Sequence, residues 1–321
     1  MKKNIVNNND NSFSRLLPVI FLFVFSAVFV PLAGPFFLFL LPMVLFLNGI
    51  LNGILKTAVV FLISFSLLLL VAVLMKFDVP AIAVFTMGMS GMLMAQITAK
   101  HYSVEKTIIY PSLLIIGAVG FYFIYDAVAL SVSPWQLVKN YITFVVEENV
   151  NLYSQLPLKA EDINFIKNNK QIIMKGFIHI FPSMVVIFSI LTIWINLLLG
   201  KNYLNRAGVI YPALMSLAGW KIPEKMIWIF IASGASLFIP ESGINFFSFN
   251  LFLVVCFLYL LQGLAIVSFL FQIKNVPAFF RYFFYFLIAV QQFLMIPVIA
   301  IGLLDMWVDF RKLLQKNQMA N

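Results

Sequence analysis

Long apolar runs separated by short polar stretches make up most of the chain. A helix that crosses a bilayer needs about 20 consecutive, mostly apolar residues, and nine runs approach or exceed that length. The pattern therefore predicts an all-α fold, a polytopic transmembrane helical bundle, with candidate spans at 16–33, 35–55, 57–75, 80–99, 107–132, 171–199, 226–240, 246–271 and 279–304.

The run at 226–240 is the weakest of these, because it is short and is interrupted by Ser233 and Ser236. A stretch this short is typical of a re-entrant or interfacial segment rather than a full span. Ile222 and Glu241 could extend it at both ends. We therefore expect eight or nine spans and favour nine.

The longest polar interval, 133–170, begins with Ser133 and Pro134, a pair typical of a helix start. We expect an amphipathic helix that lies on the outer surface or folds over the bundle as a lid, with plain interfacial anchoring as the alternative. Its apolar face would hold Trp135, Val138, Ile142, Val145 and Val146, and its polar face Gln136, Lys139, Thr143 and Glu147.

The composition indicates a membrane environment. Of 321 residues, 63% are hydrophobic and 10% are charged, whereas soluble domains carry about 25% charged residues. A soluble enzyme, a secreted module and a disordered protein are thereby excluded. One cysteine and two histidines leave too few ligands for a zinc or iron–sulfur site, and no catalytic motif is present. We expect no enzyme activity, no metal and no cofactor.

The basic residues are distributed between the apolar runs. There are 21 Lys and Arg residues against 12 Asp and Glu, a net charge of +9, but no nucleic-acid recognition motif accompanies them. A cytoplasmic N-terminus places most loop cations inside, as the positive-inside rule requires. In a nine-span chain Arg311, Lys312 and Lys316 fall on the wrong side. The lipid bilayer is the expected partner, and nucleic acid is not.

Three parts are expected along the chain. Residues 1–15 form a cytoplasmic tail, and residues 16–199 form a six-helix membrane unit that includes the outer segment 133–170. Residues 200–321 add a three-helix membrane extension with a short tail.

Ionisable residues at membrane depth are the default functional candidates, because they are costly there. Asp126 lies near the outer end of the fifth predicted span and His179 near the start of the sixth, with Lys175, Tyr122 and Tyr125 in register. These side chains could hold a small polar molecule entering from outside. An ion pair that only stabilises the two helices explains them equally well.

A second polar group, Asn48, Asn52 and Lys56, recurs every four residues at the cytoplasmic half of the second span. Such a stripe is typical of a helix-packing seam. Asp305 and Asp309, four residues apart, are a weak metal signal without a third ligand. We expect Arg311 and Lys312 to compensate their charges.

The last third of the chain resembles the YybS-like family of bacterial polytopic membrane proteins, a domain of unknown function. The resemblance is specific over 210–312 and rests on the stretches that begin at Trp220, Asn250 and Tyr259 and on a C-terminal motif. The motif residues are Gln262, Gly263, Gly302, Asp305, Trp307, Asp309 and Arg311. It implies a location in the bacterial inner membrane.

This family is usually placed near the substrate-binding components of energy-coupling-factor transporters. That implies a six-helix unit with a ligand site open to the outside. The alanine pair that often docks the energising subunit is missing from 16–33, which puts coupling to an ATPase in doubt. We therefore expect binding or transport of a small polar solute from the outer side. The alternative is a non-catalytic membrane scaffold or an assembly partner of other membrane subunits.

Overall fold

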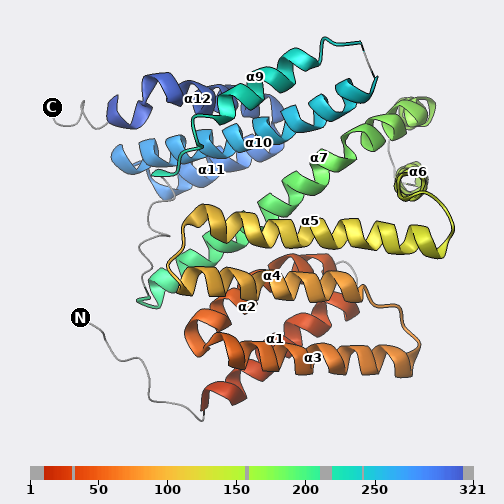
Figure 1. Cartoon of the computed structure of the whole chain (residues 1–321), viewed down its shortest axis with the longest axis vertical. Coiled ribbons are helices and arrows are strands. Elements are labelled where there is room, and N and C mark those ends of the chain that lie inside the picture. The colour runs from red at the N-terminus through yellow and green to blue at the C-terminus, as the bar shows by residue number, and fades with distance from the viewer. Residues whose placement is uncertain (1–10, 31–32, 156–158, 210–218, 241, 314–321) are drawn as a thin grey trace. The chain divides into compact units, whose positions relative to one another are not determined.

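The computed structural model describes residues 11–30, 33–155, 159–209, 219–240 and 242–313, and within these ranges it contains helices and no strand (Figure 1). The first helices are α1 (Asn11–Phe29), α2 (Gly34–Asn52), α3 (Ile54–Met75), α4 (Ala81–Ala99), α5 (Val104–Ala129) and α6 (Pro134–Gln155). The remainder are α7 (Ala160–Arg206), α9 (Met226–Ser236), α10 (Ser242–Ile273), α11 (Ala278–Val290), the short 3-10 helix η2 (Gln292–Leu294) and α12 (Met295–Val308).

Six of these helices, α2, α3, α4, α5, α7 and α10, are long and apolar enough to cross a membrane. The helix pair α11 and α12 is bent by 109° and counts as a seventh span if it is one broken span. The predicted all-helical, multi-pass architecture is confirmed, whereas the expected eight or nine spans and the cytoplasmic N-terminus are not.

The weak seventh run forms a short helix. With 11 residues, α9 is about 16 Å long, which is well below the roughly 30 Å of a bilayer core. The expectation that Ile222 extends this helix is wrong, because Ile222 lies in a non-helical segment before α9. Glu241, at the other end, lies outside the described residues.

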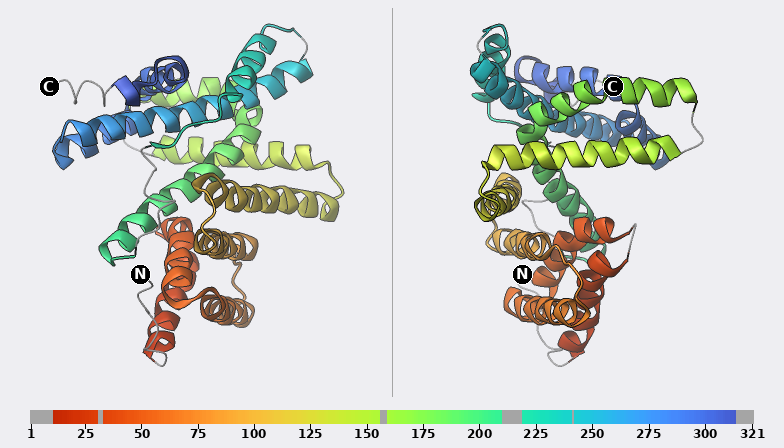
Figure 2. Two further views of the ribbon diagram at one scale, coloured as in Figure 1. Left: turned by 60° about the vertical axis from the view of Figure 1, so that its left-hand side comes forward. Right: turned by 90° about the vertical axis from the view of Figure 1, so that its right-hand side faces the viewer.

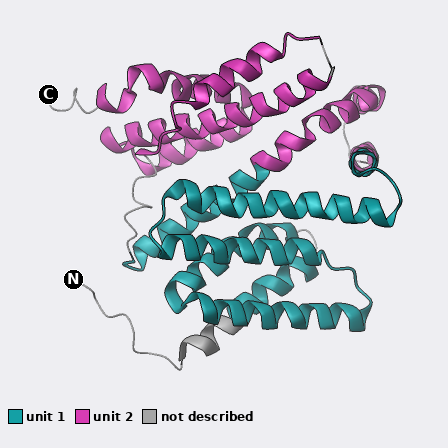
Figure 3. Cartoon of the chain, viewed as in Figure 1, with its two compact units in different colours: residues 1–140, 188–214 teal, residues 141–187, 215–321 magenta. Residues whose placement is uncertain are grey.

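The chain divides into two compact units (Figure 3). Unit 1 comprises residues 1–140 and 188–214, and unit 2 comprises residues 141–187 and 215–321, so that α7 and α6, whose first seven residues belong to unit 1, contribute to both. The parts expected from sequence, 1–15, 16–199 and 200–321, stay a prediction.

Small residues bring the helices of unit 1 into close contact around an apolar core. A side-chain carbon on Gly91 would collide with the Pro42 carbonyl of α2, and one on Gly49 would come within 2.7 Å of the Ala95 side chain. Helices can approach this closely only where side chains are minimal. The core around these contacts consists of Ile20, Val24, Leu41, Val44, Leu45, Val60, Phe61, Leu68, Val84 and Met92.

In unit 2, α6 and the first part of α7 run alongside one another (Figure 2). The Lys170 ammonium of α7 contacts the Glu147 carboxylate of α6 at 2.6 Å. The amphipathic helix predicted in this interval is present. Val138, Ile142 and Val146 are buried as expected, while Trp135 and Val145 are exposed.

Elsewhere in unit 2, α12 packs on α10 through two glycines. Added side-chain carbons would collide with the carbonyl of Val298 at Gly263 and with the carbonyl of Tyr259 at Gly302. The interruption of the apolar run at Gln262–Gly263 therefore marks a close helix crossing.

Candidate functional site

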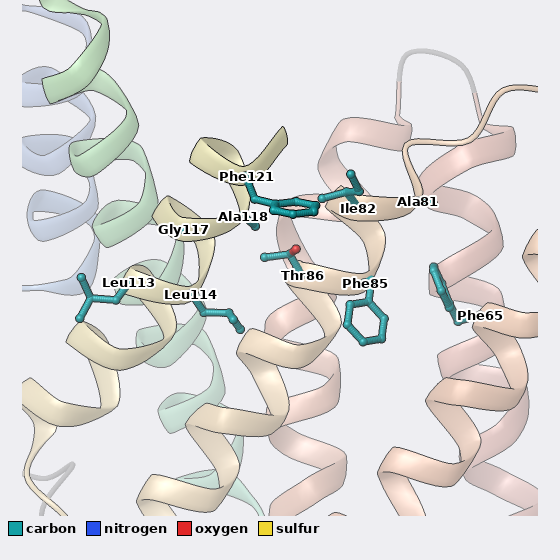
Figure 4. A pocket seen from close by; sticks show the side chains of 10 residues that line it. All are labelled: Phe65, Ala81, Ile82, Phe85, Thr86, Leu113, Leu114, Gly117, Ala118 and Phe121. Carbon is teal, nitrogen blue, oxygen red and sulfur yellow. The ribbon is translucent and has the colours of Figure 1, made fainter. Parts of the chain in front are cut away.

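An open pocket lies in unit 1 between α3, α4 and α5 (Figure 4). Its volume is about 600 Å³, within the range of roughly 300–1,000 Å³ that is usual for small-molecule sites. The lining residues are Phe65, Ala81, Ile82, Phe85, Thr86, Leu113, Leu114, Gly117, Ala118 and Phe121.

The lining of this pocket is apolar apart from one hydroxyl group, that of Thr86, which lies in its middle (Figure 4). Phe121 and Leu113 are 60% and 55% exposed, so the pocket opens at the surface of unit 1. An apolar wall offers nothing to a small ion or a sugar, because a polar group loses its water there without gaining a partner. The pocket suits a ligand with an apolar body.

One turn beyond Phe121, the predicted site residue Tyr125 continues the same face of α5. The two rings stack with centroids 6.1 Å apart, and Tyr125 is exposed. Its phenol group therefore adds a polar edge beside the apolar lining.

Asp126 points elsewhere. Five residues after Phe121, it lies about 140° around the helix from the pocket face, because successive residues differ by about 100°. Its carboxylate is half-buried, and no ion pair or hydrogen bond joins it to the other described residues. Tyr122, also predicted as a ligand residue, is exposed next to Phe123.

His179 and Lys175 belong to the part of α7 that lies in unit 2. The His179 ring packs against Phe246 and Phe249 of α10, with centroids 5.0 and 5.3 Å away, and Lys175 is exposed. Tyr122, Tyr125 and Asp126 belong to unit 1, and the joint site of all five residues stays a prediction.

Two buried asparagines that the sequence did not single out as functional act at proline breaks. In unit 1, Asn196 of α7 accepts a hydrogen bond from the Met43 N–H at 2.9 Å and donates one to the Phe39 carbonyl at 2.8 Å. An unbroken α-helix would join these two backbone groups directly. Pro42, between them, removes a donor and displaces the preceding turn.

Unit 2 contains the same arrangement at Pro182 of α7. Asn250 of α10 accepts from the Ser183 N–H and donates to the His179 carbonyl, both at 2.9 Å. In each unit, therefore, the residue after the proline and the residue three before it are bridged by the amide of another helix. We call these two arrangements the proline–asparagine joints. They satisfy backbone groups that lipid could not.

The C-terminal motif forms a buried network in unit 2. Asp305 accepts hydrogen bonds from Gln262 at 3.2 Å, from Arg311 at 3.0 Å and from the Phe310 N–H at 3.0 Å. Arg311 also donates to the Trp220 carbonyl, and Gln262 accepts from the Ile222 N–H. The network thereby fixes the segment before α9 against α10 and α12.

The other motif positions have separate roles. Asp309 forms ion pairs of 3.0 Å with Lys221 and Lys312, and hydrogen bonds from these two ammonium groups lower the pKa of its carboxyl to about 2. Arg311 pairs with Asp305 and Lys312 with Asp309, as the sequence predicts. Trp307 is 65% exposed. The described residues contain no cluster of three or more His, Cys, Asp or Glu side chains that could hold a metal ion.

The predicted polar stripe is divided between two helices. Asn48 and Asn52 lie on α2 and their amides are 3.5 Å apart. The helix ends there, because Gly53 has a φ of +95°, a conformation open chiefly to glycine. Lys56 lies on α3, beyond the break. The role of the three as a packing seam stays a prediction.

Several apolar helices, packed through glycines and buried amides, define a multi-pass helical membrane protein. Over residues 18–306 the chain matches the family described as "Predicted membrane protein (DUF2232)", and it belongs to this family. No curated protein and no solved structure gives a significant match.

Proposed function

We propose that this protein binds a small amphiphilic molecule in the unit 1 pocket, as a membrane solute-binding or transport component. The observation that carries the proposal is the apolar pocket of about 600 Å³ with the Tyr125 phenol beside it. An apolar body would fill the pocket, and a polar group would reach Tyr125. The sequence predicts a small polar solute, whereas the apolar lining favours a ligand that also has an apolar body.

The membrane position of the pocket supports entry from the bilayer. Its walls belong to three helices that are long and apolar enough to span, and its rim is exposed. With a cytoplasmic N-terminus, as the positive-inside rule favours, the pocket lies in the outer half of a bacterial inner membrane. The resemblance of residues 210–312 to the YybS-like family, and thereby to transporter substrate-binding components, agrees with this.

Two glycines on α5 provide a matched test. Gly117 lines the pocket, Gly120 does not, and an added side-chain carbon would meet nothing within 4 Å at either. Gly117→Leu should fill the pocket without a clash, and Gly120→Leu is the control. The probe is a long-chain fatty acid carrying a photoactivatable diazirine, added to the purified full-length protein.

We expect wild type and Gly120→Leu to be labelled at the peptides that contain Phe85 and Phe121, and labelling of Gly117→Leu to fall at least about tenfold, a loss of 1.4 kcal/mol or more in binding free energy. Equal labelling of all three proteins would contradict the proposal. If labelling falls in Gly117→Leu as expected, mass spectrometry of molecules that co-purify with wild type would identify the natural ligand.

The predicted site of Asp126, His179, Lys175, Tyr122 and Tyr125 supports a second version of this function. Asp126 is half-buried without a partner among the described residues, which is unusual for a carboxylate at membrane depth. Asp126→Asn should then weaken ligand retention while insertion is unchanged.

The alternative function, a non-catalytic scaffold or assembly partner, is favoured by a different observation. The buried polar side chains Asn196, Asn250, Gln262, Asp305 and Arg311 all serve contacts between segments of the chain. A scaffold would co-purify with another membrane subunit after crosslinking, and its retention would not depend on Gly117.

A further inference from the structure

Several helix ends gather at one end of unit 1 (Figure 1). Gly91 of α4 faces Pro42 of α2, and Gly49 of α2 faces Ala95, so α2 and α4 run in the same direction. Gly200 of α7 faces the Phe46 ring of α2, one turn beyond the Asn196 joint. The ends of α2, α4 and α7 and the starts of α3 and α5 therefore lie together.

This end of unit 1 is strongly basic. Among the residues whose side chains are described, it holds one acid, Glu105, and five cations, which are Lys56, Lys100, Lys106, Lys201 and Arg206. The opposite ends of α2, α3, α4 and α5 carry Lys76, Asp78 and Asp126 among the described residues. Lys100 directly follows α4, and the other four cations lie within about two turns of the end of their apolar helix, which places them near the level of lipid headgroups.

The starts of α3 and α5 share one pattern. In both helices the third residue is a lysine and the fourth is a threonine. The sequences, each beginning with the residue before the helix, are Gly53-Ile-Leu-Lys56-Thr57 and Ser103-Val-Glu-Lys106-Thr107. The hydroxyl groups of Thr57 and Thr107 donate to the Gly53 and Ser103 carbonyls at 3.0 and 3.2 Å. Lysine in the first turn is unfavourable for the helix itself, because the helix start is already positive.

Helix stability therefore does not explain this double placement, whereas attraction of an anion does. We propose that the basic end of unit 1 binds the phosphate headgroups of anionic phospholipids. Lys100, Lys106 and Arg206 are exposed, and the Lys106 ammonium lies 4.8 Å above the Tyr102 ring, an aromatic of the kind found at membrane interfaces. The positive-inside rule assigns this surface to the cytoplasmic leaflet, which carries anionic lipid.

The test uses native mass spectrometry of the purified full-length protein with equal amounts of phosphatidylglycerol and phosphatidylcholine. The test variant is Lys100→Gln/Lys106→Gln/Arg206→Gln. The control, Lys139→Gln/Lys159→Gln/Lys167→Gln, removes three cations from α6 and the start of α7. Because a cation near an anionic surface strengthens binding about fivefold, the test variant should lose about a hundredfold in affinity for phosphatidylglycerol, and the control should match wild type.

Three results would overturn the proposal. Wild type could retain both lipids equally, the test variant could keep its preference, or the control could lose as much as the test variant. Two competitors distinguish phospholipid binding from binding of other anions. Displacement of phosphatidylglycerol by millimolar inorganic phosphate would indicate a small-anion site, and displacement by polyglutamate at equal charge would indicate an acidic protein partner.

Discussion

The proline–asparagine joints of unit 1 and unit 2 use identical backbone positions in different surroundings. Asn196 is fully buried and bridges backbone groups of Phe39 and Met43, whereas Asn250 bridges those of His179 and Ser183. Each amide also donates to the carbonyl four residues before it in its own helix. In both units the bridge serves the N–H of the residue after the proline and the carbonyl three residues before the proline, while the side chains of these residues differ.

The two joints differ in the residue that supplies the bridged carbonyl. In unit 1 the bridged carbonyl belongs to Phe39, whereas in unit 2 it belongs to His179, whose ring packs against Phe246 and Phe249. Another helix with an internal proline, α5, does not use an asparagine bridge: at Pro111 the Ser112 hydroxyl donates to the Ile108 carbonyl at 2.8 Å. An amide from another helix is therefore one of two solutions, and it also holds two helices together.

The largest loss of stability is expected when the buried ion pair of Arg311 and Asp305 is broken, rather than when a proline–asparagine joint is removed. Arg311→Ala would leave Asp305 charged and buried, since their side chains are 8% and 0% exposed, and breaking such a pair costs about 3–5 kcal/mol. Thermal unfolding in detergent measures this. Lys312→Ala is the control, because its partner Asp309 retains Lys221; a loss for Arg311→Ala as small as for the control would show that Asp305 is not held as described.

The second largest loss of stability is expected when a proline–asparagine joint is removed. Asn196→Ala and Asn250→Ala each leave a buried N–H and a buried carbonyl without their bridge, at about 1–3 kcal/mol per group. We expect each variant to lose about 2–4 kcal/mol in the same unfolding assay. Asn48→Ala, at a partly exposed amide, is the control. If Asn196→Ala or Asn250→Ala lost no more stability than Asn48→Ala, that asparagine would not bridge its proline as described.

A smaller effect tests the reason for the joints. If each amide compensates for a proline, Asn196→Ala should cost less in a Pro42→Ala background, and Asn250→Ala less in a Pro182→Ala background. Residues that share contacts give coupling energies of about 0.5–3 kcal/mol, and we expect about 1–2 kcal/mol in both cycles. Strictly additive losses would mean that the amides do not serve the proline breaks.

The smallest effect is electrostatic and lies outside both joints. The folded-state pKa of Asp309 is about 2, below its ordinary value of 3.8, so its contribution to stability is present above pH 4 and is lost as pH falls toward 2. Both lysine partners are exposed, which limits the contribution to less than about 1 kcal/mol. Asp309→Asn should remove this part of the acid dependence, and an unchanged acid limb would rule it out.

The sequence predicted features that depend on near neighbours in the chain. Apolar runs gave the helices, and helical spacing gave the buried face of α6 through Val138, Ile142 and Val146. The compensation of the Asp305 and Asp309 charges by Arg311 and Lys312 followed from their closeness in sequence, and the structure assigns the individual pairs. The extension of α9 to Ile222 failed because the Ile222 N–H is held by Gln262, 40 residues away.

The asparagine roles could have been suspected, but not assigned, from sequence. Prolines within apolar runs signal backbone groups that need partners, and buried amides are suitable partners. Which amide meets which proline depends on helix contacts 153 residues apart for Asn196 and 67 apart for Asn250. The pocket was missed for the same reason, because its walls come from three helices and show no local pattern.

The sequence by itself determined the solvent, the helices and the prolines at which helical hydrogen bonding is broken, because apolar periodicity and proline act within one or two turns. The helix end at Gly53 was not predicted and lies inside the expected span 35–55. Tertiary structure decided how those breaks are repaired and where a hollow remains. Once lipid surrounds the helices, their unpaired backbone groups can be satisfied only by other parts of the protein, and the choice of partner is a property of the packed units.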